Sequence, residues 1–168
     1  MIKDVLLLTI FPAAMALAVV MDLLTMTVPN RLVLGVAALF FFVAPLAGLG
    51  LQEIGLHVAL ALGALALAFG LFSFGLIGGG DAKLFAATCL WLGPQAFVPY
   101  TIYAALIGGA LTLLLLFWRG LPLSAMLASQ GWINRLHSPE EGVPYGVALA
   151  AAGLLAYPHS PFMAALGG

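Results

Sequence analysis

Long runs of apolar residues, broken only by short polar, glycine or proline clusters, constrain this 168-residue chain more than any other feature. Only 7% of the residues are charged, whereas a water-soluble domain carries about 25%, so too few polar side chains exist to cover a water-facing surface. The formal net charge of −1 offers no basic surface for nucleic acid. A water-soluble enzyme, a nucleic-acid-binding protein and a disordered tail are therefore excluded, and we expect an integral membrane protein.

The breaks in the apolar sequence predict a bundle of about six transmembrane helices. A spanning helix needs roughly 20 mostly apolar residues, and the expected spans cover residues 5–28, 32–51, 54–76, 82–92, 97–118 and 145–166. The fourth span is too short to cross upright unless the bilayer thins or neighbouring helices shield it. We expect residues 1–168 to form one all-α, membrane-embedded domain.

Residues 119–142 form the one extended stretch outside these spans. Between Leu123 and Ile133, apolar residues recur at helical spacing beside serine and glutamine. This pattern fits an amphipathic helix in the headgroup region, with Trp132 at the interface, and it fits an ordinary connecting loop equally well.

The positive charges predict the orientation of the bundle. Four of the five lysine and arginine residues follow spans one, three and five, and only Lys3 lies on the opposite side; the four are Arg31, Lys83, Arg119 and Arg135. The positive-inside rule then places these loops in the cytoplasm and both termini outside.

Two aspartates occupy positions that are unusual in a membrane protein. Asp22 lies inside the first span, roughly 9 Å along the axis from its end at Val28. A charge at such depth costs about 2.5–3.5 kcal/mol and normally faces a partner or a watery cavity. Asp81 follows three glycines at the start of the fourth span. Structural alternatives are a buried hydrogen bond or ion pair for Asp22 and a helix N-cap for Asp81.

Placed together, the two acids predict proton-transfer chemistry. By the expected topology both lie near the same face, and two close carboxyl groups do not both ionise readily. One can therefore hold a proton while the other acts as a base on water. The preceding Gly78, Gly79 and Gly80 would let an extended substrate backbone approach closely, or they would only permit close helix packing.

Three sequence blocks resemble the type IV prepilin peptidases, which are membrane aspartic proteases with a Gly-x-Gly-Asp motif. The first block runs from Asp22 to Pro29-Asn30, the second is Gly78-Gly79-Gly80-Asp81-Ala82-Lys83, and the third is Pro144-Tyr145-Gly146. The blocks occur in the family's order and extend over most of the chain.

The resemblance implies that Asp22 and Asp81 are catalytic aspartates that cut the leader from prepilins at the cytoplasmic face of the bacterial inner membrane. It implies supporting roles for Gly78, Gly80, Pro29, Asn30, Pro144, Tyr145 and Gly146. Lys83 would influence the aspartates or anchor the chain at the interface. Prepilins and the lipid bilayer are the implied partners, and no cofactor is expected.

A departure from the larger family members narrows the subtype. Those members carry an N-terminal region with paired cysteines, which is associated with methylating the new pilin N-terminus. Here the first span begins almost at Met1, and Cys89 is the one cysteine. We therefore expect the short, peptidase-only form found with tight-adherence (Flp-type) pilus systems, without that region.

The remaining candidate residues predict no metal site. His57, His137 and His159 are scattered, and we expect His57 to be interfacial. Cys89 is expected to pack as a small apolar residue, and the tryptophans Trp91, Trp118 and Trp132 to mark interface belts.

Two other functions compete with the peptidase. Both acids could relay protons in a small transporter, or serve packing in an assembly subunit of a secretion apparatus. The Pro-Asn and Pro-Tyr-Gly blocks argue against the transporter, because a proton relay needs no such turns.

Overall fold

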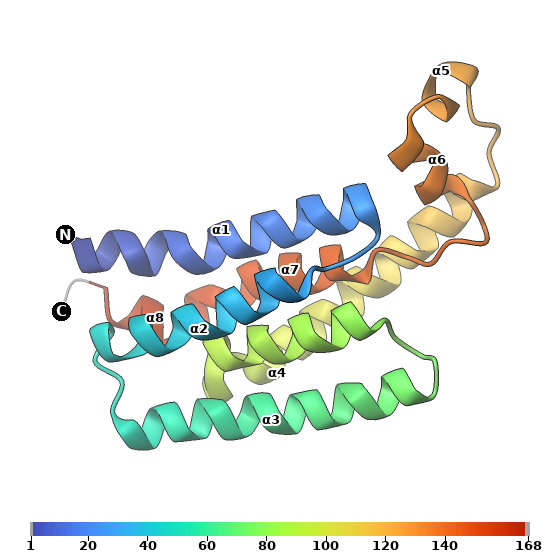
Figure 1. Ribbon diagram of the computed structural model, residues 1–168. Helices are drawn as coiled ribbons and strands as arrows, with labels where there is room; N and C mark the ends of the chain where they lie inside the picture. The colour runs from blue at the N-terminus through green and yellow to red at the C-terminus, as the bar shows by residue number, and fades with distance from the viewer. Residues whose placement is uncertain (1, 167–168) are drawn as a thin grey trace.

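The computed structural model describes residues 2–166, and every regular element assigned there is helical. The elements in chain order are α1 (Ile2–Thr25), α2 (Asn30–Leu46), α3 (Leu51–Ser73), α4 (Gly79–Arg119), α5 (Ala125–Ala128), α6 (Gly131–His137), α7 (Tyr145–Ala156), the 3₁₀ helix η1 (Tyr157–His159) and α8 (Pro161–Ala164). Four segments are long and apolar enough to cross a membrane, namely α1, α3, α4 and Tyr145–Ala164, and α2 is a shorter apolar helix. The expected all-α membrane bundle is confirmed (Figure 1).

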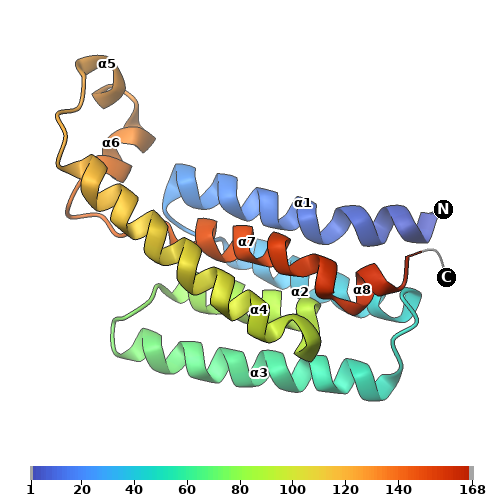
Figure 2. The ribbon, with the colours of Figure 1, turned by 180° about the vertical axis from the view of Figure 1, so that it is seen from behind.

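Helix α4 consists of two arms that run in opposite directions (Figures 1 and 2). Gly93 has φ 68° and ψ −178°, which is not a helical conformation. Beyond it the chain turns back, so the rings of Phe85 and Tyr100 stack with their centroids 5.4 Å apart. In a straight helix, 15 residues would separate them by about 22 Å. The arms, residues 79–92 and 94–119, correspond to the short fourth span and the fifth span predicted from Gly93-Pro94.

Several helix ends differ from the predicted spans. Helix α1 ends at Thr25, where Met26 takes a positive φ of 54°, and α2 starts directly after Pro29. The span predicted over 145–166 is present as the candidate span Tyr145–Ala164, but its helix is interrupted, because α7 ends at Ala156 and is followed by η1 and α8. Pro158 and Pro161 explain the interruption, since proline has no N–H to continue the helical hydrogen bonds.

Residues 119–142 form neither a single helix nor a plain loop. They contain α5 and α6, which are separated at Ser129 and Gln130. The two short helices lie beyond the end of α1, outside the main bundle (Figure 1). Trp132, at the start of α6, is 39% exposed.

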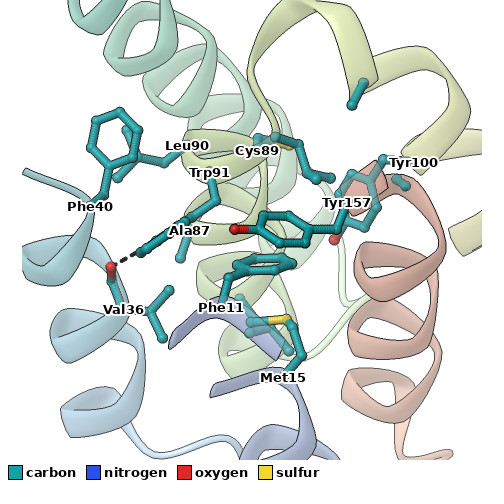
Figure 3. Packing of buried hydrophobic residues seen from close by; sticks show 14 of the residues in the cluster. Phe11, Met15, Val36, Phe40, Ala87, Cys89, Leu90, Trp91, Tyr100 and Tyr157 are labelled. Carbon is teal, nitrogen blue, oxygen red and sulfur yellow. Dashed lines mark hydrogen bonds between the residues drawn. The ribbon is translucent and has the colours of Figure 1, made fainter. Parts of the chain in front are cut away.

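The core of the bundle is an aromatic cluster between α1, α2, α4 and the C-terminal helices (Figure 3). Trp91 is fully buried and its indole N–H donates to the carbonyl of Val36 at 2.9 Å. Its ring lies against Phe11 and Phe162. The expectation that Trp91 marks the membrane interface is therefore wrong.

His57 is also part of the interior rather than the interface. It is 2% exposed, and its Nδ1 lies 2.7 Å from the carbonyl oxygen of Leu90. The imidazole fills the space beside Gly93, where an added Cβ would lie 2.3 Å from the ring. The interfacial expectation for His57 is wrong because α3 packs directly against the turn of α4. Cys89 is fully buried, as predicted for a packing residue.

Candidate active site

Six helix ends meet at one end of the bundle, which we call the carboxylate end because both aspartates lie there. It comprises the last turns of α1 and α3, the first turns of α2 and α7, and both ends of α4 (Figures 1 and 2). The opposite end holds the turn at Gly93 and the connection between α2 and α3. The topology therefore collects residues from distant parts of the sequence at one place.

Asp22 reaches from α1 to the N-terminus of α7. The residue is 3% exposed, and its Oδ2 accepts a hydrogen bond from the backbone N–H of Val147 at 3.1 Å. The backbone amide of Gly146 also interacts with this carboxylate. The first N–H groups of a helix lack intrahelical partners, and the N-cap residue of α7, Pro144, has no side-chain acceptor. Asp22 supplies one, and its negative charge suits the positive end of the helix dipole.

Asp81 lies in the first turn of α4 and interacts with the same amide. The N-cap of α4 is Gly78, so Asp81 is the third helical residue and the N-cap expectation for it is wrong. Its carboxylate interacts with the backbone amides of Gly78 and Gly146 and, electrostatically, with Asp22. The two carboxyl groups thus converge on the N-termini of two helices, although they are 59 positions apart in the sequence.

The glycines beside the carboxylates have no room for a side chain. A Cβ on Gly146 would lie 2.7 Å from Oδ2 of Asp22, and one on Gly78 would lie 2.8 Å from Oδ2 of Asp81. A Cβ on Gly80 would lie 3.4 Å from the backbone of Val28. Gly78 and Gly146 therefore allow close approach to the carboxylates, whereas a Cβ at Gly80 would only reach ordinary contact distance from the α1–α2 connection.

An apolar cleft of about 870 Å³ opens beside Asp81. Its walls come from the second half of α3, both arms of α4 and the segment that leads into α7, and they include Leu67, Leu71, Phe85, Ala104, Gly142 and Tyr145. Asp81 is thus accessible from the cleft, while Asp22 is nearly covered at the N-terminus of α7. The arrangement presents a carboxyl pair at the end of an apolar groove.

Comparison with known proteins identifies the family of this chain. The profile of the type IV leader peptidase family matches residues 9–113, which is more than half of the chain and includes both Asp22 and Asp81. The chain belongs to the type IV leader peptidase family. Neither the curated proteins nor the solved structures gave a match. The family match ends before Pro144-Tyr145-Gly146. The role of α7 in this peptidase is therefore inferred only from the contacts that α7 makes in the structure.

Three motif residues of the peptidase lie away from the carboxylates. Lys83 is exposed, and its Nζ donates to Oδ1 of Asn30 at 3.0 Å. Asn30 begins α2 and follows Pro29, so this bond joins the start of α2 to the first arm of α4. The hydrogen bond to Asn30 is a contact that neither of the two roles considered for Lys83 included, and both roles stay predictions.

Tyr145 fits into a notch in the second arm of α4. A Cβ on Gly108 would lie 2.1 Å from its hydroxyl oxygen, so only glycine leaves room for the ring. The ring also lines the cleft. Gly108 was not identified from the sequence. The signal that could have identified it is the Gly108-Gly109 pair inside a predicted helix. The amide of Val147 was also missed, because backbone groups leave no mark in a sequence.

The described residues hold no cluster of metal-ligating side chains. Across residues 2–166, no three histidine, cysteine, aspartate or glutamate side chains gather in a way that could hold an ion. At the carboxylate end Asp22 and Asp81 interact with each other, and Glu141 lines the cleft together with Asp81.

Proposed function

We propose that this peptidase is a membrane aspartic endopeptidase that removes the leader from type IV prepilins, with Asp22 and Asp81 as its catalytic pair. The observation that carries the proposal is the convergence of the two carboxyl groups beside an apolar cleft at one end of the bundle. A peptidase needs an acid and a base on either side of one water molecule, and two interacting carboxyl groups that share a proton provide both.

The two aspartates have complementary roles in the proposed reaction. The ionised carboxyl group takes a proton from water, and the water oxygen bonds to the scissile carbonyl carbon. The protonated carboxyl group hydrogen-bonds to the carbonyl oxygen and stabilises the charge that develops there. Proton transfer to the leaving nitrogen then breaks the peptide bond and restores the shared proton. The amide of Gly146, which interacts with both carboxylates, keeps the pair in place.

The cleft supports a substrate with an apolar helix next to an extended peptide. Its walls are mostly aliphatic and aromatic side chains of membrane-spanning helices, which suit the hydrophobic start of a pilin. Asp81 lies at the membrane-surface end of this groove, where a leader would emerge into water. Pilins or pseudopilins of the Flp type are the substrates that we propose.

The orientation follows from the charges at the same end. Arg31 and Lys83 lie near the starts of α2 and α4 at the carboxylate end, and Arg119 ends α4 there. The positive-inside rule places this end in the cytoplasm, at the inner membrane. The proposed cleavage is then cytoplasmic.

Separate replacement of each aspartate by asparagine tests the proposal. Asparagine keeps an oxygen acceptor for the amides of α7 but cannot act as a base, so Asp22→Asn and Asp81→Asn should each lower leader removal by about 100-fold or more. The readout is the gel shift of a co-expressed prepilin, with membrane abundance and melting temperature measured in parallel. Glu140→Gln is the matched control, because Glu140 is an exposed carboxylate in the connection between α6 and α7.

Each competing function gives a different result in this experiment. Normal cleavage by either asparagine variant would remove that residue from the mechanism. Proton flux without cleavage in the wild type would favour a transporter. Loss of both variants from the membrane, with a wild type that cleaves no prepilin, would favour an assembly subunit.

A further inference from the structure

Two arginines at the carboxylate end bind backbone carbonyl groups rather than acids. Arg119, the last residue of α4, donates from Nε to the carbonyl of Leu136 at 2.8 Å and from Nη2 to the carbonyl of Gly142 at 2.8 Å. Arg135, in α6, donates to the carbonyl of Leu24 in α1. Neither arginine lines the cleft, and nothing derived above for the carboxyl pair uses them.

These bonds form a closed ring with the Asp22–Val147 hydrogen bond. Leu24 lies two residues after Asp22, and Gly142 lies two residues before Pro144, the N-cap of α7. Arg135 links the end of α1 to α6, and Arg119 links α6 to Gly142. From Gly142 the chain continues into α7, where the Val147 N–H binds Asp22 and closes the ring. The ring thus tethers the C-terminal end of α1 and the segment before α7, and α1 and α7 are the two helices that Asp22 joins.

The chemistry of the donors explains why arginine suits both positions. The last carbonyl groups of α1 have no intrahelical partner, and a cation there is favoured by the helix dipole. At Arg119, two nitrogen atoms of one planar guanidinium bind two carbonyls that are six residues apart in the sequence. Lysine would keep the charge but not this two-pronged geometry.

We propose that Arg119 and Arg135 are positioning residues that set the amides of α7 against the catalytic carboxyl groups. This inference rests on the proposed peptidase function. Without the ring, the 138–144 segment loses its tether to the end of α4, and the N-terminus of α7 can move away from Asp22. Displacement of a catalytic group by about 1 Å costs on the order of 100-fold in rate. The cleft walls on α3 and α4 stay in place, and only the wall that contains Gly142 moves with the segment, so turnover should suffer more than substrate binding.

Substitution of Arg119 in the full chain tests this role. The assay uses purified wild type, Arg119→Lys and Arg119→Gln in detergent with a prepilin peptide. We expect both variants to lower kcat by roughly 10- to 100-fold with a smaller change in KM, and to shift the pH profile of kcat. Arg31→Gln is the matched control, because Arg31 is an exposed arginine at the same end and its loss removes the same charge. This control should keep the wild-type kcat and pH profile.

The outcomes separate this role from a purely structural one and from failure of the proposed function. A purely structural role would reduce the amount of folded protein but leave kcat per folded molecule and the pH profile unchanged, and it would overturn the inference. An Arg119→Lys enzyme with wild-type kcat, or an equal loss in Arg31→Gln, would also overturn it. If Arg119→Lys does not fold, Arg135→Lys provides the same test, and failure of both to fold counts against the inference. A folded wild type that cleaves no prepilin peptide would contradict the proposed function itself.

Discussion

Asp22 is both a helix cap and a candidate catalytic group, and both roles use the same carboxylate. Its Oδ2 accepts the Val147 N–H, and the Gly146 amide interacts with the same carboxylate. The structural alternative considered for this residue is therefore present in the molecule, and it does not exclude the catalytic one. A carboxylate held by amides is a well-positioned base, because its orientation is fixed before any substrate arrives.

Gly146→Ala tests how closely α7 has to approach Asp22. The added methyl group would lie 2.7 Å from Oδ2 of Asp22 and 2.9 Å from a methyl carbon of Val28, so it would displace the carboxylate. We expect prepilin cleavage to fall by on the order of 100-fold. Gly109→Ala is the control, since its Cβ meets nothing within 4 Å. Equal activity of Gly146→Ala and wild type would show that the amide contact is dispensable.

A second residue-scale prediction concerns the pH dependence of cleavage. Two interacting carboxyl groups lose their protons in two steps that belong to the pair. If the form with one proton is active, the cleavage rate should follow a bell-shaped pH profile. The activity should also persist in the presence of chelators and thiol reagents. Cys89→Ala should keep nearly full activity because Cys89 only packs. Activity that is lost with a chelator and restored by added metal would contradict the metal-free pair.

The candidate acids could be predicted from the sequence, but their surroundings could not. Asp22 and Asp81 are conspicuous because a charge in an apolar run is costly. The groups that interact with them are backbone amides, and the two arginines that tether the neighbouring segments were explained by the positive-inside rule alone. That rule counts charges and does not indicate what each guanidinium binds.

At the scale of elements, the turn inside α4 decides where the site lies. The first arm carries Asp81, and the second arm returns to the carboxylate end and forms one wall of the cleft. Without a reversal at Gly93, the second arm would continue away from Asp81. A backbone conformation that only glycine adopts readily thus brings Asp81 and the cleft together.

Gly93→Ala should destabilise the protein more than substitution of a glycine that has open space around it. Its φ of 68° with ψ of −178° belongs almost only to glycine, at a cost of about 1–3 kcal/mol for other residues. A methyl group would also lie 2.3 Å from the His57 ring. We expect a lower melting temperature in detergent, with Gly63→Ala in α3 as the control because it meets nothing within 4 Å. The double variant His57→Ala/Gly93→Ala should remain unstable, since it removes the clash but not the strain.

The breaks between helices could be predicted from the sequence, but the faces that the helices bury could not. Pro29 and the Gly93-Pro94 pair interrupt the helical hydrogen-bond pattern, so the sequence places these two breaks within a few residues, although Pro12, Pro45 and Pro99 lie inside helices. An apolar side chain, however, is stable both in the core and against lipid. Hydropathy therefore did not distinguish buried Trp91 and His57 from interfacial residues, and their burial depends on how α2, α3 and α4 pack.

For the whole molecule, the charges predict one orientation in the membrane. In a Cys89→Ala background, a cysteine at Arg31 should react with a membrane-impermeant thiol reagent only from the cytoplasmic side. A cysteine at Gln52 should react only from the opposite side, because this exposed residue begins α3 at the other end of the bundle. Whole cells and inverted vesicles provide the two measurements. Labelling of Arg31→Cys in whole cells would reverse the orientation and contradict cytoplasmic cleavage.

The hydrogen bond between Asp22 and Val147 also sets an order of events during synthesis. The two residues are 125 positions apart, so at about 5–20 residues per second the ribosome needs roughly 6–25 seconds to reach Val147 after Asp22. During this time α1 enters the membrane with a carboxyl group whose helix partner has not been made. The carboxyl pair is also incomplete until Asp81 has been synthesised. The α7 backbone amides that bind the pair are missing until that helix has been synthesised. On the proposed mechanism a nascent chain therefore has no assembled carboxyl pair, and cleavage begins only after α7 has entered the bundle.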